Sequence, residues 1–91
     1  SQEYFKAVQT AGLKARVVDC VFEDFKNGQY KVISFFAKRA RGLMARYAVQ
    51  QQVRTPLQLR KFALDGYAFA PAPSTLSRLV FRRKPGVAPD A

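Results

Sequence analysis

Four cationic side chains and one glycine gather in a short stretch of this chain, at Lys38, Arg39, Arg41, Gly42 and Arg46. Lysine and arginine bind phosphate oxygens through charge-assisted hydrogen bonds, and arginine can contact two oxygens at once. A glycine inside a helix costs roughly 1 kcal/mol relative to alanine. Gly42 therefore indicates a place where an anion such as a phosphate approaches the backbone closely. These residue types predict binding to a phosphate backbone, which by itself gives no base specificity.

A helix from about residue 37 to residue 52 must position this group. At about 100° per residue, the four cations and Gly42 fall on one half of the helical wheel. The other half is apolar and is expected to face a core; it consists of Ala37, Ala40, Leu43, Met44, Tyr47 and Ala48. No acidic residue lies between Phe25 and Leu64, so we expect no acid to compensate the cations. Four phosphate contacts predict a log–log salt slope of about −3.6 on duplex DNA.

The overall charge also points to a polyanionic partner. The 91 residues contain 16 Lys and Arg against 6 Asp and Glu, a net charge of +10. A sustained field of one sign suits nucleic acid or an acidic membrane surface, and duplex DNA is the partner that we expect. A membrane role is disfavoured because the apolar half of the basic helix lacks Trp and suits a protein core. A solvated cationic surface without any partner is the plain alternative.

Catalytic chemistry has few candidates. The chain has no histidine and one cysteine, Cys20, which excludes an imidazole base, a His-based metal site and an intrachain disulfide within these residues. No metal and no cofactor are expected. Lys38 could act as a nucleophile activated by its arginine neighbours, which would indicate glycosylase- or lyase-like chemistry on DNA or a nucleotide. Ser34 lacks an adjacent base and either binds a ligand or satisfies local backbone groups. Glu3 could supply an acid or base, or simply cap an element.

Aromatic and apolar residues give weaker signals. Five aromatic residues could stack on bases, although their spacing favours a core position: Tyr30, Phe35, Phe36, Tyr47 and Phe62. Cys20 alternates with apolar neighbours and is expected to be buried in a strand. One cysteine and no signal peptide fit a reducing cytoplasm. No apolar run approaches the roughly 20 residues that span a bilayer.

The N-terminal half is expected to form a hairpin. Residues 3–8 are expected to end a helix, with a break at residues 10–12. Two antiparallel strands are expected at residues 15–23 and 30–36. Asn27 and Gly28 join them, because both residues of an Asn-Gly turn can take positive φ.

The C-terminal half is expected to complete an α+β fold in which the hairpin packs under the basic helix. Thr55 as N-cap and Pro56 at the first helical position predict a second helix over residues 56–64. A short extended piece at 67–70 and a last strand within 78–83 follow, and residues 84–91 are expected to fray.

Five blocks of the sequence occur in an order that a known family shares. They are Lys26-Asn27-Gly28, the run KVISFFAKRARGLMARY from Lys31, Thr55-Pro56-Leu57-Gln58-Leu59, Leu64-Asp65-Gly66-Tyr67, and Leu79-Val80-Phe81-Arg82. The most specific block is Ser34-x-x-Ala37-Lys38-x-Ala40-Arg41-Gly42. From Ser1 to about Arg83, the chain resembles the C-terminal part of the bacterial peroxide-stress protein YaaA family.

This resemblance implies that residues 1–83 are the C-terminal portion of a longer cytoplasmic protein with an unusual α/β fold and a positively charged cleft. It also implies DNA binding and resistance to hydrogen peroxide by limiting iron-driven oxidative damage. Where the N-terminal part is missing, one wall of the cleft is missing with it, and uncovered apolar surface favours self-association. Three interpretations follow: a DNA-binding module, an enzyme acting on DNA or a nucleotide, or a structural C-terminal half whose basic face packs on the absent N-terminal part.

Overall fold

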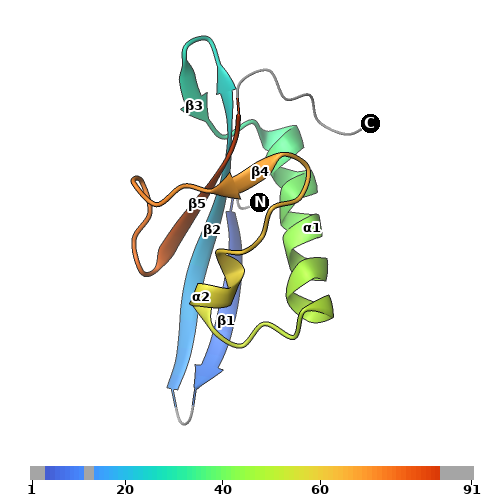
Figure 1. The fold of residues 1–91 in the computed structure, drawn as a ribbon, viewed down its shortest axis with the longest axis vertical. Helices are drawn as coiled ribbons and strands as arrows, with labels where there is room; N and C mark the ends of the chain where they lie inside the picture. Colours follow the sequence, from blue (N-terminus) through green and yellow to red (C-terminus); the bar gives the residue numbers. More distant parts are fainter. Residues whose placement is uncertain (1–3, 12–13, 85–91) are drawn as a thin grey trace.

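One mixed sheet and two helices form the fold. A computed structural model describes residues 4–11 and 14–84, with side chains from residue 18 onward. The elements are β1 (Tyr4–Ala11), β2 (Lys14–Lys26), β3 (Gln29–Lys31), α1 (Ser34–Gln50), α2 (Pro56–Leu59), β4 (Tyr67–Phe69) and β5 (Arg78–Arg83). The strand order is β1-β2-β5-β4, and β3 pairs with the end of β2 (Figure 1). Pairing is antiparallel except between β2 and β5, which are parallel. The predicted α+β class is confirmed.

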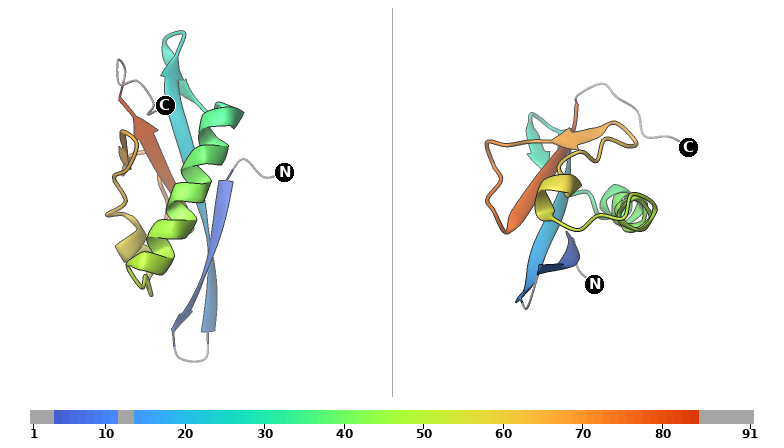
Figure 2. Two further views of the ribbon diagram at one scale, coloured as in Figure 1. Left: turned by 90° about the vertical axis from the view of Figure 1, so that its right-hand side faces the viewer. Right: turned by 60° about the horizontal axis from the view of Figure 1, so that its bottom comes forward.

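The core lies between one face of the sheet and the two helices (Figure 2). Phe22 on β2 is its centre, with ring centroids 5.3 to 5.7 Å from those of Phe62, Tyr67 and Phe81. The predicted apolar half of α1 is confirmed: Ala37, Ala40 and Met44 are fully buried, and Leu43, Tyr47 and Ala48 pack against the core. Cys20 is fully buried in β2, as its alternation predicted.

The hairpin turn is confirmed, but its second strand is shorter than expected. Asn27 and Gly28 have φ of 55° and 82°, as an Asn-Gly turn requires. The prediction of a strand over 30–36 is wrong, because β3 ends at Lys31 opposite Asp24. Further along the same edge of β2, Val21 is already paired with Tyr4 of β1. A longer β3 would therefore find too few free backbone groups to pair with.

Both helices differ from their predicted bounds. Since β3 ends early, α1 begins at Ser34, three residues before the expected start. The prediction that α2 extends to residue 64 is wrong. After Leu59 the backbone N–H groups bond three residues back, as in the 3.1 Å bond from Phe62 N–H to the Leu59 carbonyl. This tighter turn brings the side chains of Leu59 and Phe62 to one side, and both are fully buried.

The sequence predicted the end of a helix over residues 3–8, but the described part of that range, residues 4–8, belongs to a strand. Residues 4–11 pair in register with residues 14–21, from Tyr4 opposite Val21 to Ala11 opposite Lys14. The edge of β2 supplies the hydrogen-bond partners, and this tertiary pairing overrides the local pattern. The expected break at residues 10–12 is also wrong for Thr10 and Ala11, which belong to β1. Glu3, residues 12–13 and all of the expected frayed tail except Lys84 lie outside the described residues.

The last part of the chain follows its prediction. β4 and β5 coincide with the expected extended piece and final strand, and they pair antiparallel from Tyr67 opposite Arg83 to Phe69 opposite Phe81. The helix start at Pro56 is confirmed as well, and Gln58 Oε1 accepts the backbone N–H of Thr55 at 3.0 Å.

Candidate nucleic-acid interface

One side of α1 forms an exposed stripe along the helix. Its members are three or four residues apart: Phe35, Lys38, Gly42, Arg46 and Val49, which we call the α1 stripe. This spacing keeps residues on one face of a helix. The two ends are apolar and open, because Phe35 is 75% and Val49 78% exposed. The stripe therefore presents two cations and a glycine between two exposed apolar side chains.

The other two predicted phosphate-binding residues flank the stripe. Arg41 is half-buried on one flank. Arg39 lies on the other flank, and its Nε is 3.7 Å from Oδ2 of Asp65. The expectation that no acid compensates the cations is therefore wrong for Arg39, because the turn before β4 brings Asp65 beside α1. Within the described part of the chain, Lys38, Arg41 and Arg46 form no ion pair.

Gly42 occupies the middle of α1 and the middle of the α1 stripe. A β carbon added there would meet no atom within 4 Å outside the adjoining residues and the local helix backbone. The packing of the described residues therefore does not require glycine at this position, although glycine costs the helix roughly 1 kcal/mol.

A buried ionic network fixes the first turns of α1 against the sheet. Its centre is Arg83, which is 1% exposed. Arg83 Nε donates to Asp24 Oδ1, Nη1 donates to the Asp65 carbonyl at 3.0 Å, and Nη2 donates to the Tyr67 hydroxyl at 3.1 Å. The Tyr67 hydroxyl in turn donates to Asp24 Oδ2 at 2.6 Å. These four residues, the Arg83 network, join β2, the turn before β4, β4 and β5.

The positive charge at the centre of the Arg83 network is compensated by carboxylates. Burial by itself lowers the pKa of Arg83, but its hydrogen bond to Asp24 and the charges of Asp24 and Asp65 raise that pKa overall. Burial and the hydrogen bond to Asp24 raise the pKa of Tyr67, which keeps the phenol neutral. Asp65 Oδ2 also lies 3.3 Å from Arg83 Nη1. Two carboxylates thus face the guanidinium of Arg83, and Asp65 also reaches Arg39.

The Arg83 network reaches α1 through two residues. The Arg83 guanidinium lies 4.9 Å from the centre of the Phe36 ring, and Asp65 pairs with Arg39. Asp65 holds a left-handed φ of 57°, and the following Gly66 has a φ of 82°. Sequence reasoning missed this network, because its members are far apart in the chain. In the sequence, the only pointer to two of its members, Asp65 and Tyr67, was the family-shared block that contains them with Gly66.

Of the three weak catalytic candidates, the structure describes Ser34 and Lys38. Ser34 was expected at the end of a strand, but it is the first residue of α1 and is exposed. Lys38 is exposed one turn later on the same helix. Glu3 lies outside the described residues.

The aromatic residues divide between core and surface. Phe62 is fully buried, and Tyr47 packs edge-on against it at 5.5 Å, so the favoured core interpretation is confirmed for both. Phe36 is half-buried beneath Arg83. Tyr30 is covered by the Arg82 guanidinium at 4.3 Å. Phe35 contradicts the core interpretation, because it lies in the open at the start of the α1 stripe.

Comparison with known proteins settles the family. The family model for the peroxide stress protein YaaA matches residues 1–73. The chain belongs to the YaaA family. A UPF0246 protein of Paracidovorax citrulli is 68% identical to this YaaA-family chain over 84 residues, which cover 92% of the chain and 32% of the relative. A UPF0246 protein of Ralstonia pickettii is 63% identical over 84 residues, with coverages of 92% and 33%.

This YaaA-family chain spans about a third of the length of the curated relatives that it matches. The resemblance in the sequence blocks is thereby confirmed at the level of the family. Among the described helices, none is long and apolar enough to cross a membrane.

Proposed function

We propose that this YaaA-family chain is the DNA-binding part of a cytoplasmic protein of the peroxide stress response. In this proposal Lys38, Gly42 and Arg46 of the α1 stripe, together with Arg41, contact the phosphate backbone of duplex DNA, and binding helps to limit iron- and peroxide-driven damage. The observation that supports it most is the set of three cations on one side of α1 that form no ion pair within the described residues.

The dimensions of the helix suit a groove. Lys38 and Arg46 are eight residues apart, a rise of about 12 Å at 1.5 Å per residue. The major groove of B-DNA is also about 12 Å wide, so the two cations can contact phosphates on opposite walls.

Arg39 contributes less than the sequence predicted. Its guanidinium already lies beside Asp65, so its attraction to a phosphate is partly offset. Three free phosphate contacts give a log–log salt slope of about −2.7, instead of the −3.6 or so that four contacts give.

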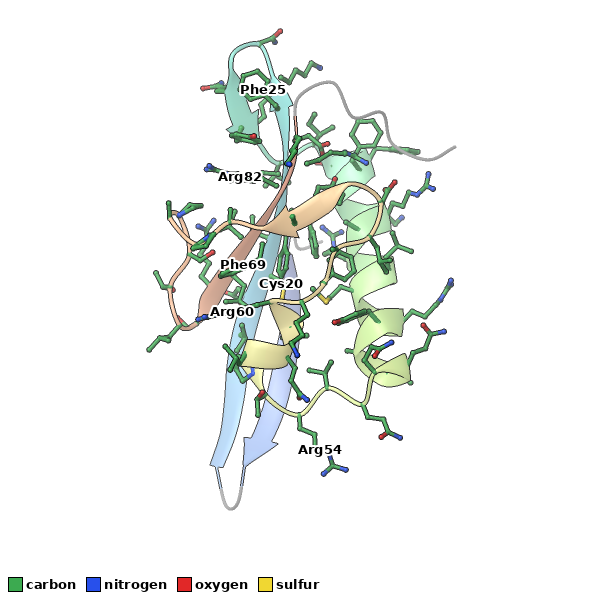
Figure 3. All side chains as sticks on the ribbon, in the orientation of Figure 1. Cys20, Phe25, Arg54, Arg60, Phe69 and Arg82 are labelled. Carbon is green, nitrogen blue, oxygen red and sulfur yellow. The ribbon has the colours of Figure 1, made fainter. Side chains whose placement is uncertain are left out.

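Single charge removals test this surface. We expect Lys38→Gln and Arg46→Gln each to weaken binding of a fluorescein-labelled duplex roughly fivefold in fluorescence anisotropy, because each loses a contact worth about 1 kcal/mol. Arg54→Gln is the matched control: Arg54 is exposed in the loop before α2, outside the α1 stripe (Figure 3). Equal effects of all three substitutions would contradict the proposal, since only the net charge would then matter.

A second candidate is that the α1 stripe packs on the remainder of a full-length YaaA-type protein. The exposure of Phe35 and Val49 favours it, because apolar side chains suit a protein partner better than phosphates. The chain also covers only 32% of a close relative. Calorimetric titration with the other two thirds of the Paracidovorax citrulli relative distinguishes the candidates. Association that Val49→Ser weakens more than Lys38→Gln supports packing, whereas no association argues against it.

A further inference from the structure

A cavity of about 250 Å³ opens between the end of α2 and the loop that joins β4 to β5. It lies toward the β4 edge of the sheet, where Arg60 and Phe69 are labelled in Figure 3. Six residues line it: Arg60, Phe69, Pro71, Ser74, Thr75 and Leu76. None of these residues belongs to the α1 stripe or to the Arg83 network.

Arg60, which lines this cavity, carries a hydrogen-bond donor without a protein partner in the described part of the chain. Its Nε is buried and has no hydrogen-bond partner among the described residues. Its guanidinium carbon lies 5.1 Å from the centre of the Phe69 ring. A buried donor left unpaired costs about 1–3 kcal/mol. Arg83 shows the contrast, because its Nε, Nη1 and Nη2 all donate to protein acceptors.

The loop supplies a second donor and is itself well fixed. Thr75 Oγ1 accepts the backbone N–H of Arg78 at 3.1 Å, which leaves its hydroxyl proton for another acceptor. The Ser74 hydroxyl is fully engaged, since it donates to the Ala70 carbonyl at 2.6 Å and accepts the Val80 N–H at 2.9 Å. Ser74 therefore holds the loop in place, and Thr75 remains available to a ligand.

The remaining lining is apolar, and none of the lining residues is acidic. Phe69 and Pro71 form part of the wall, and Leu76 is 80% exposed at its rim. A guanidinium and a hydroxyl donor beside such a wall suit an oxyanion attached to an apolar body. The volume corresponds to about eight waters at roughly 30 Å³ each. That is below the 300 Å³ or so at which pockets for drug-sized ligands begin, so a body of about one ring suits it.

We propose that this cavity is a binding site for a small organic oxyanion, a phosphate monoester or a carboxylate carried on a single flat ring. The guanidinium of Arg60 and the hydroxyl of Thr75 donate to the oxyanion, and the ring lies against Phe69 and Leu76. The site is separate from the proposed DNA-binding surface, so either proposal can fail without the other.

Nuclear magnetic resonance of the ¹⁵N-labelled chain tests this site, because arginine Nε–H groups give their own signals. The probes are phenyl phosphate, benzoate and inorganic phosphate. We expect the Arg60 Nε–H signal to shift and saturate with phenyl phosphate or benzoate, at least tenfold more tightly than with inorganic phosphate. The tighter of the two ring-bearing probes identifies the oxyanion class. Shifts of Arg60 no larger than those of Arg54 would overturn the proposal.

Three variants complete the test. Arg60→Lys keeps the charge but loses the Nε donor, and we expect at least tenfold weaker binding, followed through the backbone signals of Ser74 and Thr75. Thr75→Val keeps the shape of the loop residue and removes its hydroxyl, with an expected loss of about threefold. Arg54→Lys is the matched control and should change nothing. Unchanged binding in both Arg60→Lys and Thr75→Val would overturn the proposal.

Discussion

Replacing Gly42 by alanine separates its role in binding from its role in the helix. Gly42 lies in the middle of α1. Apart from the two adjoining residues and the local helix backbone, no atom lies within 4 Å of a β carbon added there. Alanine there should therefore raise the free energy of unfolding by about 1 kcal/mol. For a domain of this size, that change raises Tm by roughly 4–8 °C.

The same methyl group would stand between the helix backbone and any phosphate that approaches it. If one phosphate contact worth about 1 kcal/mol is lost, affinity for duplex DNA falls roughly fivefold. We therefore expect Gly42→Ala to be more stable in thermal unfolding followed by circular dichroism, and weaker in fluorescence anisotropy.

Gly28→Ala is the matched control for this experiment, since it adds the same methyl group in the hairpin turn. Gly28 has a φ of 82°, so alanine should destabilise the chain and leave its affinity for DNA unchanged. A Gly42→Ala chain that melts higher but binds DNA as tightly as the wild type would refute a close approach of phosphate. A Gly42→Ala chain with a lower Tm than the wild type would refute the claim that the structure leaves room for a β carbon at residue 42.

Two further predictions concern buried groups. Asp24→Asn should lower the free energy of unfolding in urea by about 3 kcal/mol, because it leaves the buried charge of Arg83 poorly compensated; the half-buried Asp19→Asn should cost far less, and equal costs would contradict the role of the Arg83 network. Burial and the charge of Asp19 raise the pKa of Cys20 from 9.0 to about 12. The folded chain then keeps a proton that the unfolded chain loses, so stability falls as pH rises from about 9 by up to roughly 1.4 kcal/mol per unit. Thermal unfolding at several pH values should show that Cys20→Ala loses stability less steeply above about pH 9 than the wild type. An equally steep loss in Cys20→Ala would contradict the raised pKa of Cys20.

The elements that the sequence predicted well are those with local signals. The turn at Asn27 and Gly28 follows from backbone conformations that few residues tolerate. The apolar half of α1 follows from a period of 3.6 residues, and its buried members are among those predicted. Pro56 marks a helix start for a similar local reason.

The features that the sequence did not predict depend on contacts between distant segments. β1 is a strand because the edge of β2 pairs with it, and β3 is short because β1 occupies the same edge. The Arg83 network requires the parallel pairing of β2 with β5, which places Asp24 opposite Arg83. The pairing of Arg39 with Asp65 depends on the same folding, so charge counting along the chain overestimated the free cations of α1.

The salt dependence of DNA binding tests the proposed function most directly. For the wild type we expect log affinity to fall with log salt concentration with a slope of about −2.7, from contacts by Lys38, Arg41 and Arg46. A variant with all three replaced by Gln should lose most of this slope, while Lys26→Gln with Lys61→Gln and Arg54→Gln, exposed cations outside α1, should retain it. The same slope in both triple variants would contradict a phosphate-binding surface on α1.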